Sequence, residues 1–197
     1  SRGLLPSVEW KMKRHKTKWY TGDTISVGIG QGYNQATPLQ LAFATGILAN
    51  KGKAFQPHLV QKVLDKQDNI IKEPPTTPWY TLDLKPENIE HVHNALVAVT
   101  HPGGTAARAS KGAEYQLAGK TGTSQVIGIK QGERYNEEEI QERYRDHALF
   151  VAYAPADNPK IALAVIVENG GHGGATAAPI ARQVMDYYLL GKMPEVL

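Results

Sequence analysis

Residues 148–167, ALFVAYAPADNPKIALAVIV, contain two strongly apolar runs joined by a six-residue link. In both runs, 148–154 and 161–167, apolar side chains occupy consecutive as well as alternate positions, so both faces of each strand should be buried. The link is too short for the crossover that a parallel pair needs, and the runs therefore predict two antiparallel strands. Such a sheet requires helices on both of its sides.

Three helix signals surround this pair of strands. Thr37-Pro38-Leu39-Gln40 combines a capping threonine, a proline at the first helical position and a capping-box glutamine, and the helix should end at Gly52. A second helix is predicted over residues 86–99 and a third from Pro179 to Leu190. The expected apolar faces are Ile89, Val92, Leu96 and Val97 in the second helix, and Ile180, Val184, Tyr187 and Tyr188 in the third. The order of elements predicts an α+β fold, an antiparallel sheet sandwiched by helices.

The other segments have weaker patterns. Residues 1–36 contain several glycines and are expected to form loops and turns. A strand is predicted at 58–64 with a hairpin return at Ile70-Ile71, followed by a rigid extended loop at 73–81. Residues 115–127 predict a strand interrupted at Gly119–Gly122. Residues 136–145 predict a short, charged, solvated helix.

Composition limits the possible function classes. Apolar residues make up 41% of the 197, charged residues 21%, and there is no cysteine, which excludes disulfides and thiol catalysis. No apolar run reaches the 18 residues typical of a membrane span. Residues 1–20 carry six Lys or Arg against Glu9, whereas the other 177 residues carry 16 basic and 18 acidic side chains. We interpret the basic segment as a solvated one, because no nucleic-acid-binding motif accompanies it.

Gly119-Lys120-Thr121-Gly122-Thr123-Ser124 is the most informative candidate site. Thr121 and Thr123 alternate to one side of a strand and offer hydroxyl donors to a carboxylate. Lys120 supplies a positive charge, and Gly122 lets another backbone approach the strand closely. The alternative is an ordinary surface turn. Lys-Thr-Gly is one of the motifs of penicillin-binding proteins and class A β-lactamases, although a tripeptide alone has low specificity.

Over most of its length, from about Trp19 to Gly191, the chain resembles the C-terminal part of the transpeptidase domain of class B penicillin-binding proteins. Within that class it is most similar to the elongation-specific group, penicillin-binding protein 2. The stretches that carry the resemblance are 22–32 (GDTISVGIGQG), 36–42 (ATPLQLA), 119–126 (GKTGTSQV), 145–150 (RDHALF), 154–159 (APADNP) and 168–171 (ENGG).

The resemblance implies the penicilloyl serine transferase fold, here incomplete, with residues 1–197 forming the C-terminal portion of one transpeptidase domain. It implies a serine-type D-Ala-D-Ala transpeptidase that cross-links peptidoglycan during cell elongation and is a covalent target of β-lactams. Lys120 and Thr123 are the expected catalytic residues, Thr123 through its N–H in the oxyanion hole. Substrate binding is expected from Lys120, Thr121, Gly122 and Thr123.

The same resemblance implies the surroundings of the site. The expected partners are stem peptides ending in D-Ala-D-Ala, β-lactams, the upstream part of the same domain and a SEDS-family glycan polymerase, with no nucleic acid. No cofactor or metal is expected. The implied location is the periplasmic face of the inner membrane of a Gram-negative bacterium.

The family's nucleophile lies in a Ser-x-x-Lys motif and a second motif is Ser-x-Asn. Neither motif occurs at the five serines of this chain, Ser1, Ser7, Ser26, Ser110 and Ser124. We therefore expect the nucleophile and its lysine base upstream of this sequence and expect residues 1–197 alone to be inactive. A non-enzymatic β-lactam or peptidoglycan sensor with the same fold is the alternative.

Four histidines are further candidates for a functional role. His91 and His93 are two residues apart on a helix and face different directions, which favours a solvated helix face over a metal pair. Asp146-His147 could form a general-base dyad, but a structural hydrogen bond is the simpler interpretation. His172 lies in a glycine-rich segment before a helix, where an anion could bind; we interpret this segment as a mobile loop at the mouth of the cleft.

Overall fold

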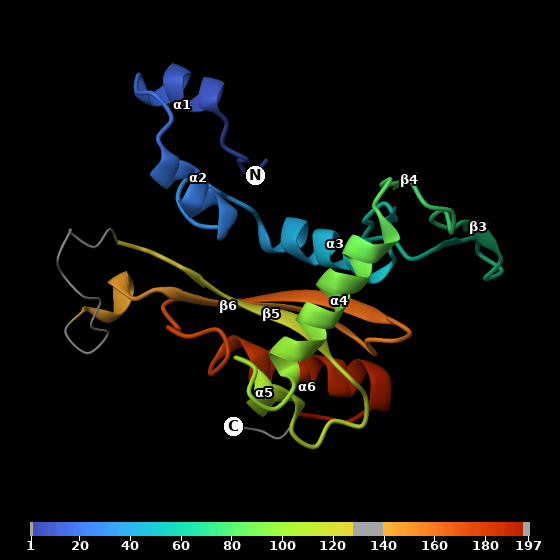
Figure 1. The fold of residues 1–197 in the computed structure, drawn as a ribbon. Coiled ribbons are helices and arrows are strands. Elements are labelled where there is room, and N and C mark those ends of the chain that lie inside the picture. The colour runs from blue at the N-terminus through green and yellow to red at the C-terminus, as the bar shows by residue number, and fades with distance from the viewer. Residues whose placement is uncertain (1, 128–139, 195–197) are drawn as a thin grey trace. The chain divides into compact units, whose positions relative to one another are not determined.

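The computed structural model describes residues 2–127 and 140–194. The chain divides into two compact units, Ser1–Leu41 and Ala42–Leu197, and each is described by itself. The central helices and strands can be followed in Figure 1.

The first unit contains two short helices, α1 (Val8–His15) and α2 (Thr21–Gly28). Ser7 caps α1 by accepting the N–H of Trp10, and Lys16 ends it in the left-handed conformation with φ 58°. The expectation of loops and turns over 1–36 was therefore wrong for these two segments. Their helicity depends on caps and on contacts within the unit, because neither has a long apolar repeat.

A buried lysine holds this unit together. Lys11 is 5% exposed and its ammonium forms an ion pair with Asp23 on α2. The ammonium also lies 4.8 Å from the centre of the Tyr20 ring. The hydrogen bond from Lys11 and that from the Tyr20 N–H lower the pKa of the Asp23 carboxyl. One of the six basic side chains of residues 1–20 is thus a structural group, which the charge pattern could not reveal.

Helix α3 (Pro38–Ala49) begins in the first unit and continues into the second. The predicted capping box is confirmed, since Thr37 Oγ1 accepts the Gln40 N–H and Gln40 Oε1 accepts the Thr37 N–H. At the other end the N–H of Gly52 donates to Ile47 O, with φ 94° at Gly52. This left-handed conformation explains the glycine that the sequence places there.

Two small antiparallel sheets follow. Strand β1 (Lys53–Ala54) pairs with β4 (Tyr80–Thr81), and β2 (Val63–Leu64) pairs with β3 (Ile70–Lys72). The hairpin return at Ile70-Ile71 is confirmed. The strand predicted over 58–64 is present at its last two residues only, and the predicted loop 73–81 ends in β4. Pairing between short segments depends on partners that periodicity does not identify.

The central sheet has the order β5–β6–β7, formed by Ala118–Ser124, His147–Ala154 and Ile161–Val167, and is antiparallel throughout. The two strands predicted from residues 148–167 are confirmed. Strand β5 is continuous, so the expected interruption at Gly119–Gly122 was wrong. An unbroken register from Ala118 opposite Tyr153 to Ser124 opposite His147 keeps the glycines in the strand.

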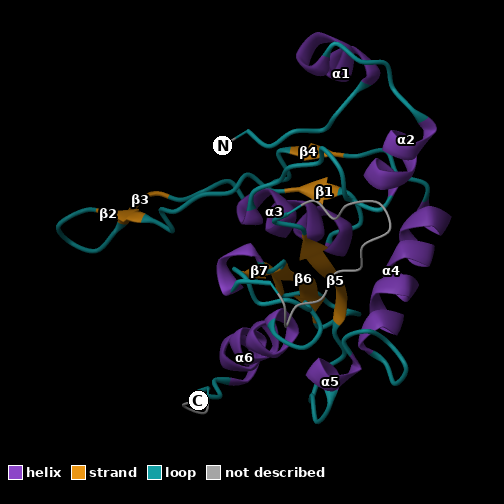
Figure 2. Cartoon of the chain, turned by 90° about the vertical axis from the view of Figure 1, so that its left-hand side faces the viewer, coloured by secondary structure: helices purple, strands orange, loops and turns teal. Residues whose placement is uncertain are grey.

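Helices cover both faces of this sheet, as expected. On one face α4 (Pro86–Thr100) packs against β5; on the other, α6 (Ala177–Leu190) packs against β6 and β7, next to the short α5 (Ala107–Ser110). Figure 2 shows α4 and α6 on separate sides of the strands. The core on the α6 side contains Phe150, Ala152 and Met185, and the α4 side contains Ala118 and Tyr153.

The predicted apolar face of α4 is confirmed at Leu96 and Val97 but not at Val92, and the predicted face of α6 is wrong. In α4, Val92 is exposed, and His93 occupies the inner position, where its Nδ1 lies 2.7 Å from the Tyr153 hydroxyl. In α6 the expected stripe is exposed. The buried side chains of α6 are small or flexible: Ala177, Ala178, Ala181 and Met185. A helix that lies close to a sheet needs small residues at the contact, so the larger apolar side chains point elsewhere.

The charged segment predicted at 136–145 lies largely outside the described residues. Its described end contains a short 3-10 helix, Glu142–Tyr144.

Candidate functional site

Strand β5 carries the candidate site and lies at one edge of the described sheet, with β6 as its neighbour. Thr121 pairs with Phe150 and Thr123 with Ala148, two residues whose side chains are buried on the α6 side. Paired residues of an antiparallel sheet share a face. The expectation that Thr121 and Thr123 share one side of the strand is therefore confirmed, and Lys120 belongs to the opposite face.

Lys120 is exposed, and its side chain turns back to its own strand. The ammonium donates to the carbonyl oxygen of Thr121 at 2.8 Å. A positive charge is thereby held at the backbone of β5, the strand that also carries Thr121 and Thr123. Such a group can attract and hold an anionic ligand.

Thr105 is a site residue that sequence reasoning missed. It lies in the turn after α4, and its hydroxyl is 3.1 Å from the hydroxyl of Thr121. The turn is tight, because a Cβ at Gly104 would lie 2.2 Å from Val99 O. Two consecutive glycines, Gly103 and Gly104, are the signal for this turn in the sequence, but they do not reveal its contact with Thr121, sixteen residues away.

A glycine-rich loop, residues 170–174, packs against the same strand. A Cβ at Gly173 would lie 2.1 Å from Leu149 O and 2.7 Å from Gly122 O, and one at Gly174 would lie 2.2 Å from Thr105 O. Any side chain at Gly173 or Gly174 would therefore force the backbone apart. These glycines allow the loop to contact both β5 and the Thr105 turn.

The loop is attached to the start of β6. The Asn169 N–H donates to His147 Nδ1 at 2.9 Å, the Asn169 side chain donates to Arg145 O, and the Gly171 N–H donates to Asp146 O. The interpretation of His147 as a structural hydrogen-bonding group is confirmed. Ser124, the last residue of β5, pairs with His147, so this attachment lies at the end of the candidate strand.

The remaining histidines lie in different surroundings. His91 is exposed, as expected, whereas His93 is half-buried against Tyr153, so the solvated-face interpretation was wrong for His93. In the described part of the chain, no cluster of three or more His, Cys, Asp or Glu side chains could hold a metal ion. His172 is exposed on the glycine-rich loop, and the N–H groups of Ala177 and Ala178 already donate to Gly173 O.

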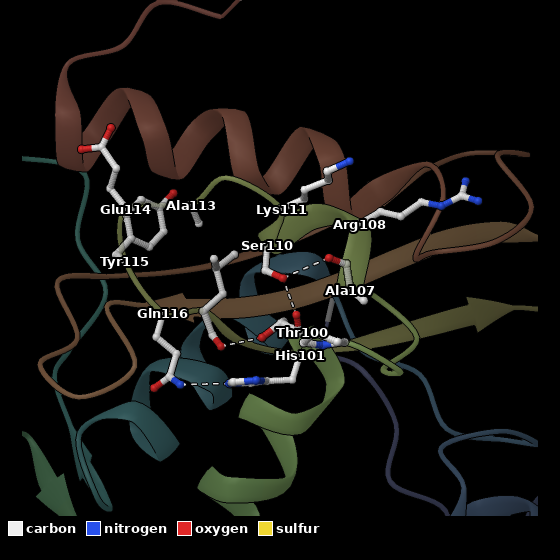
Figure 3. Close-up of a pocket in the computed structure, with 12 residues that line it drawn as sticks. Thr100, His101, Ala107, Arg108, Ser110, Lys111, Ala113, Glu114, Tyr115 and Gln116 are labelled. Atoms are coloured by element: carbon white, nitrogen blue, oxygen red, sulfur yellow. Dashed lines mark hydrogen bonds between the residues drawn. The ribbon is translucent and has the colours of Figure 1, made fainter.

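A hollow of about 690 Å³ lies elsewhere in the second unit, between the end of α4, α5 and the segment that leads to β5 (Figure 3). The Ser110 hydroxyl there donates to Thr100 O, and His101 contacts the Gln116 side chain. None of the residues that line it belongs to the Lys-Thr-Gly segment. The Ser110 hydroxyl and the Gln116 amide already have protein partners, and β5 remains the candidate functional site.

A charged network joins α6 to one wall of this hollow. Asp186 accepts hydrogen bonds from Arg182 Nε and the Tyr115 hydroxyl, each at 2.8 Å. Partial burial by itself raises the pKa of Asp186, but these hydrogen bonds outweigh it and hold the pKa below the ordinary 3.8. Burial raises the pKa of the Tyr115 hydroxyl, and the bonded Asp186 carboxylate raises it further. The network therefore consists of a carboxylate, a guanidinium and a neutral phenol.

Comparison with known proteins agrees with this geometry. Residues 5–186 match the family described as the penicillin binding protein transpeptidase domain. The chain belongs to this family. It is 45% identical, over 196 residues, to the peptidoglycan D,D-transpeptidase MrdA of Haemophilus influenzae, and the match covers 98% of this chain and 30% of that protein.

Solved structures show the same fold. The crystal structure of Pseudomonas aeruginosa PBP2 in complex with WCK 5153 has a TM-score of 0.78 and 44% identity, covering 98% of this chain and 38% of that one. Penicillin-binding protein A from Mycobacterium tuberculosis, solved as an imipenem acyl-enzyme complex, has a TM-score of 0.60 and 30% identity, covering 83% of this chain and 33% of that one.

The chain thus spans about a third of the length of these proteins. The helices within residues 2–127 and 140–194 are too short or too polar to cross a bilayer.

Proposed function

We propose that this chain is the substrate-binding part of a peptidoglycan D,D-transpeptidase that acts in cell elongation and maintains rod shape. The observation that carries the proposal is the arrangement on β5, where Thr121 and Thr123 share one face and the Lys120 ammonium is held at the same strand. A peptide that ends in D-Ala-D-Ala presents a carboxylate and a scissile carbonyl a short distance apart. An exposed strand with cationic and hydroxyl donors suits both groups.

Each residue of the segment has a proposed role. Lys120 polarises the site by its positive charge, and the Thr121 and Thr123 hydroxyls bind the terminal carboxylate of the substrate or of a β-lactam. The N–H of Thr123 donates to the oxyanion that forms when the carbonyl is attacked. Gly122 leaves room for the substrate backbone, which adds to β5 as a further strand.

The nucleophile is proposed to lie in a part of the protein outside these 197 residues. None of the five serines is followed three residues later by a lysine, and a serine without a base is a weak nucleophile. In the complete domain the serine attacks the D-Ala-D-Ala bond of the donor peptide, forms an ester with its acyl group and releases the terminal D-Ala. The acyl group then passes to an amine of a neighbouring stem peptide and the serine is regenerated. Acylation by imipenem in the mycobacterial relative supports the same chemistry with β-lactams.

The setting of the reaction is proposed from the same relatives. Residues 1–197 would form the C-terminal portion of one transpeptidase domain and dock on its upstream part. The complete protein would work at the periplasmic face of the inner membrane with a SEDS-family glycan polymerase, which makes the strands that are then cross-linked. The similarity to a peptidoglycan D,D-transpeptidase supports the cross-linking reaction in this proposal.

Labelled penicillin and mass spectrometry test the proposal. The complete protein should form a stoichiometric adduct on a serine outside residues 1–197, whereas the isolated 197 residues should form none. An adduct on Ser26, Ser110 or Ser124 would contradict the proposed division of the site. Repeated release of D-Ala from a pentapeptide substrate, with the remaining acyl group passed to water or to an amine, then distinguishes an enzyme from a sensor that is acylated without turnover.

A further inference from the structure

We propose that Thr105 is a positioning residue for Thr121, an inference that rests on the proposed function. Its hydroxyl, in the turn between α4 and α5, lies 3.1 Å from the hydroxyl of Thr121. That distance is within the hydrogen-bonding range of two hydroxyl groups. Thr121 is therefore not oriented by its own strand alone, and a second segment of the chain determines where its proton points.

The direction of the hydrogen bond decides what Thr121 can do. Each threonine hydroxyl has one proton and two acceptor lone pairs. When Thr105 donates to Thr121 Oγ1, the proton of Thr121 remains available for the substrate carboxylate. A carboxylate accepts and cannot donate, so its arrival favours this direction of the bond. The Thr105 hydroxyl then orients the Thr121 hydroxyl, so that the Thr121 proton points to the ligand.

The position of Thr105 is determined by contacts on both sides. The N–H of Ala106, its neighbour, donates to Val99 O at 2.9 Å, and Ala106 itself is 1% exposed. On the other side, Gly174 of the glycine-rich loop approaches Thr105 O so closely that a Cβ would lie 2.2 Å away. The Thr105 backbone is therefore held between the end of α4 and this loop, while its side chain stays exposed beside Thr121.

Thr105→Val and Thr105→Ser in the complete protein test this role. Valine keeps the shape of threonine and removes the hydroxyl, so the second-order rate constant for acylation by penicillin should fall roughly three- to tenfold, as expected for one neutral hydrogen bond. Serine restores the hydroxyl and should recover most of the rate. An unchanged melting temperature of Thr105→Val would show that the fold is intact.

A double-mutant cycle shows whether Thr105 acts through Thr121. In a Thr121→Val background the hydroxyl partner is gone, so Thr105→Val should have no further effect on acylation. Thr100→Val is the matched control. Thr100 is the last residue of α4, and its hydroxyl donates to Leu117 O and not to Thr121. Its effect on acylation, if any, should be the same in both backgrounds.

The failures of this inference and of the proposed function are distinguishable. If the unaltered complete protein forms no penicillin adduct, the proposed function is wrong. If it does, and Thr105→Val acylates at the unaltered rate, the positioning role is overturned. An equal loss with and without the Thr121 hydroxyl would also overturn it, because Thr105 would then act independently of Thr121.

Discussion

The backbone N–H of Asn169 donates to Nδ1 of His147 at 2.9 Å and joins the turn after β7 to the first residue of β6. The glycine-rich loop that follows Asn169 packs on Gly122 and Thr105. His147 therefore supports the candidate site through the loop and has no contact role in the proposed chemistry.

Two substitutions of His147 should behave differently. Asparagine can place its Oδ1 near the position of Nδ1 and accept the same N–H, whereas glutamine, one methylene longer, places its oxygen elsewhere. We expect His147→Gln to lower the melting temperature by about 2–4 °C, the effect of about 1 kcal/mol in a chain of this size. His147→Asn should lower the melting temperature by a clearly smaller amount. Equal decreases in melting temperature for the two variants, measured by thermal denaturation, would contradict a stabilising hydrogen bond from the Asn169 N–H to His147 Nδ1.

Removal of the Lys120 ammonium should slow acylation of the complete protein. The ammonium is held at the Thr121 carbonyl, on the strand that carries the proposed carboxylate-binding threonines. Lys120→Ala should reduce the acylation rate by penicillin at least about 10²-fold, comparable to the loss of one preorganised electrostatic contact. Stopped-flow acylation measures this, and a rate within a factor of a few of the unaltered protein would exclude the role.

The two threonines should act as a unit on the carboxylate. Both lie on the α6 side of β5, and they are proposed to bind the same group. A cycle of Thr121→Val and Thr123→Val should show a coupling of about 0.5–3 kcal/mol in the acylation rate. Additive effects would mean that they bind separate parts of the ligand. The Thr123 N–H survives substitution by valine, so the cycle measures the hydroxyl alone.

The Asp186 network should make stability depend on pH in the acid range. Because its hydrogen bonds hold the pKa of Asp186 below 3.8 in the folded chain, the stabilisation is present above that value and is lost as the pH falls through the folded pKa. Asp186→Asn should cost about 1 kcal/mol at neutral pH, a modest amount because the side chain is partly solvated.

Denaturant unfolding at several pH values measures this contribution. The stability of the unaltered chain and of Asp186→Asn should converge below about pH 4, where Asp186 starts to protonate on unfolding. Tyr115→Phe is the matched control, since it removes one hydrogen bond to Asp186 and keeps the Asp186 carboxylate. If the free energies of unfolding of the unaltered chain and of Asp186→Asn differ by the same amount at every pH, Asp186 contributes through the shape of its side chain and not through its charge.

Several features were predictable because they are local. The Thr37 and Gln40 side chains cap a helix start three residues apart, and alternation along β5 places Thr121 and Thr123 on one face. The apolar runs at 148–154 and 161–167 specify strands by their own composition. Each of these depends on backbone geometry within one element or across one short turn, and this geometry is nearly independent of the rest of the chain.

Other features depend on packing between distant segments. His93 lies inside because Tyr153, sixty residues later, offers it a hydrogen bond, and α6 presents Ala181 and Met185 to the sheet in place of its larger side chains. Periodicity identifies an apolar stripe but not which stripe meets a partner.

The α+β architecture, the two central strands and the Lys-Thr-Gly segment with its threonines on one face follow from the amino-acid sequence. The contact between Thr105 and Thr121 and the hydrogen bond from the Asn169 N–H to His147 appear only once the chain is folded. The same holds for the approach of Gly173 and Gly174 to neighbouring backbone. The physical reason is that such contacts arise from close packing of elements far apart in the chain, where a fraction of an ångström separates a hydrogen bond from a clash.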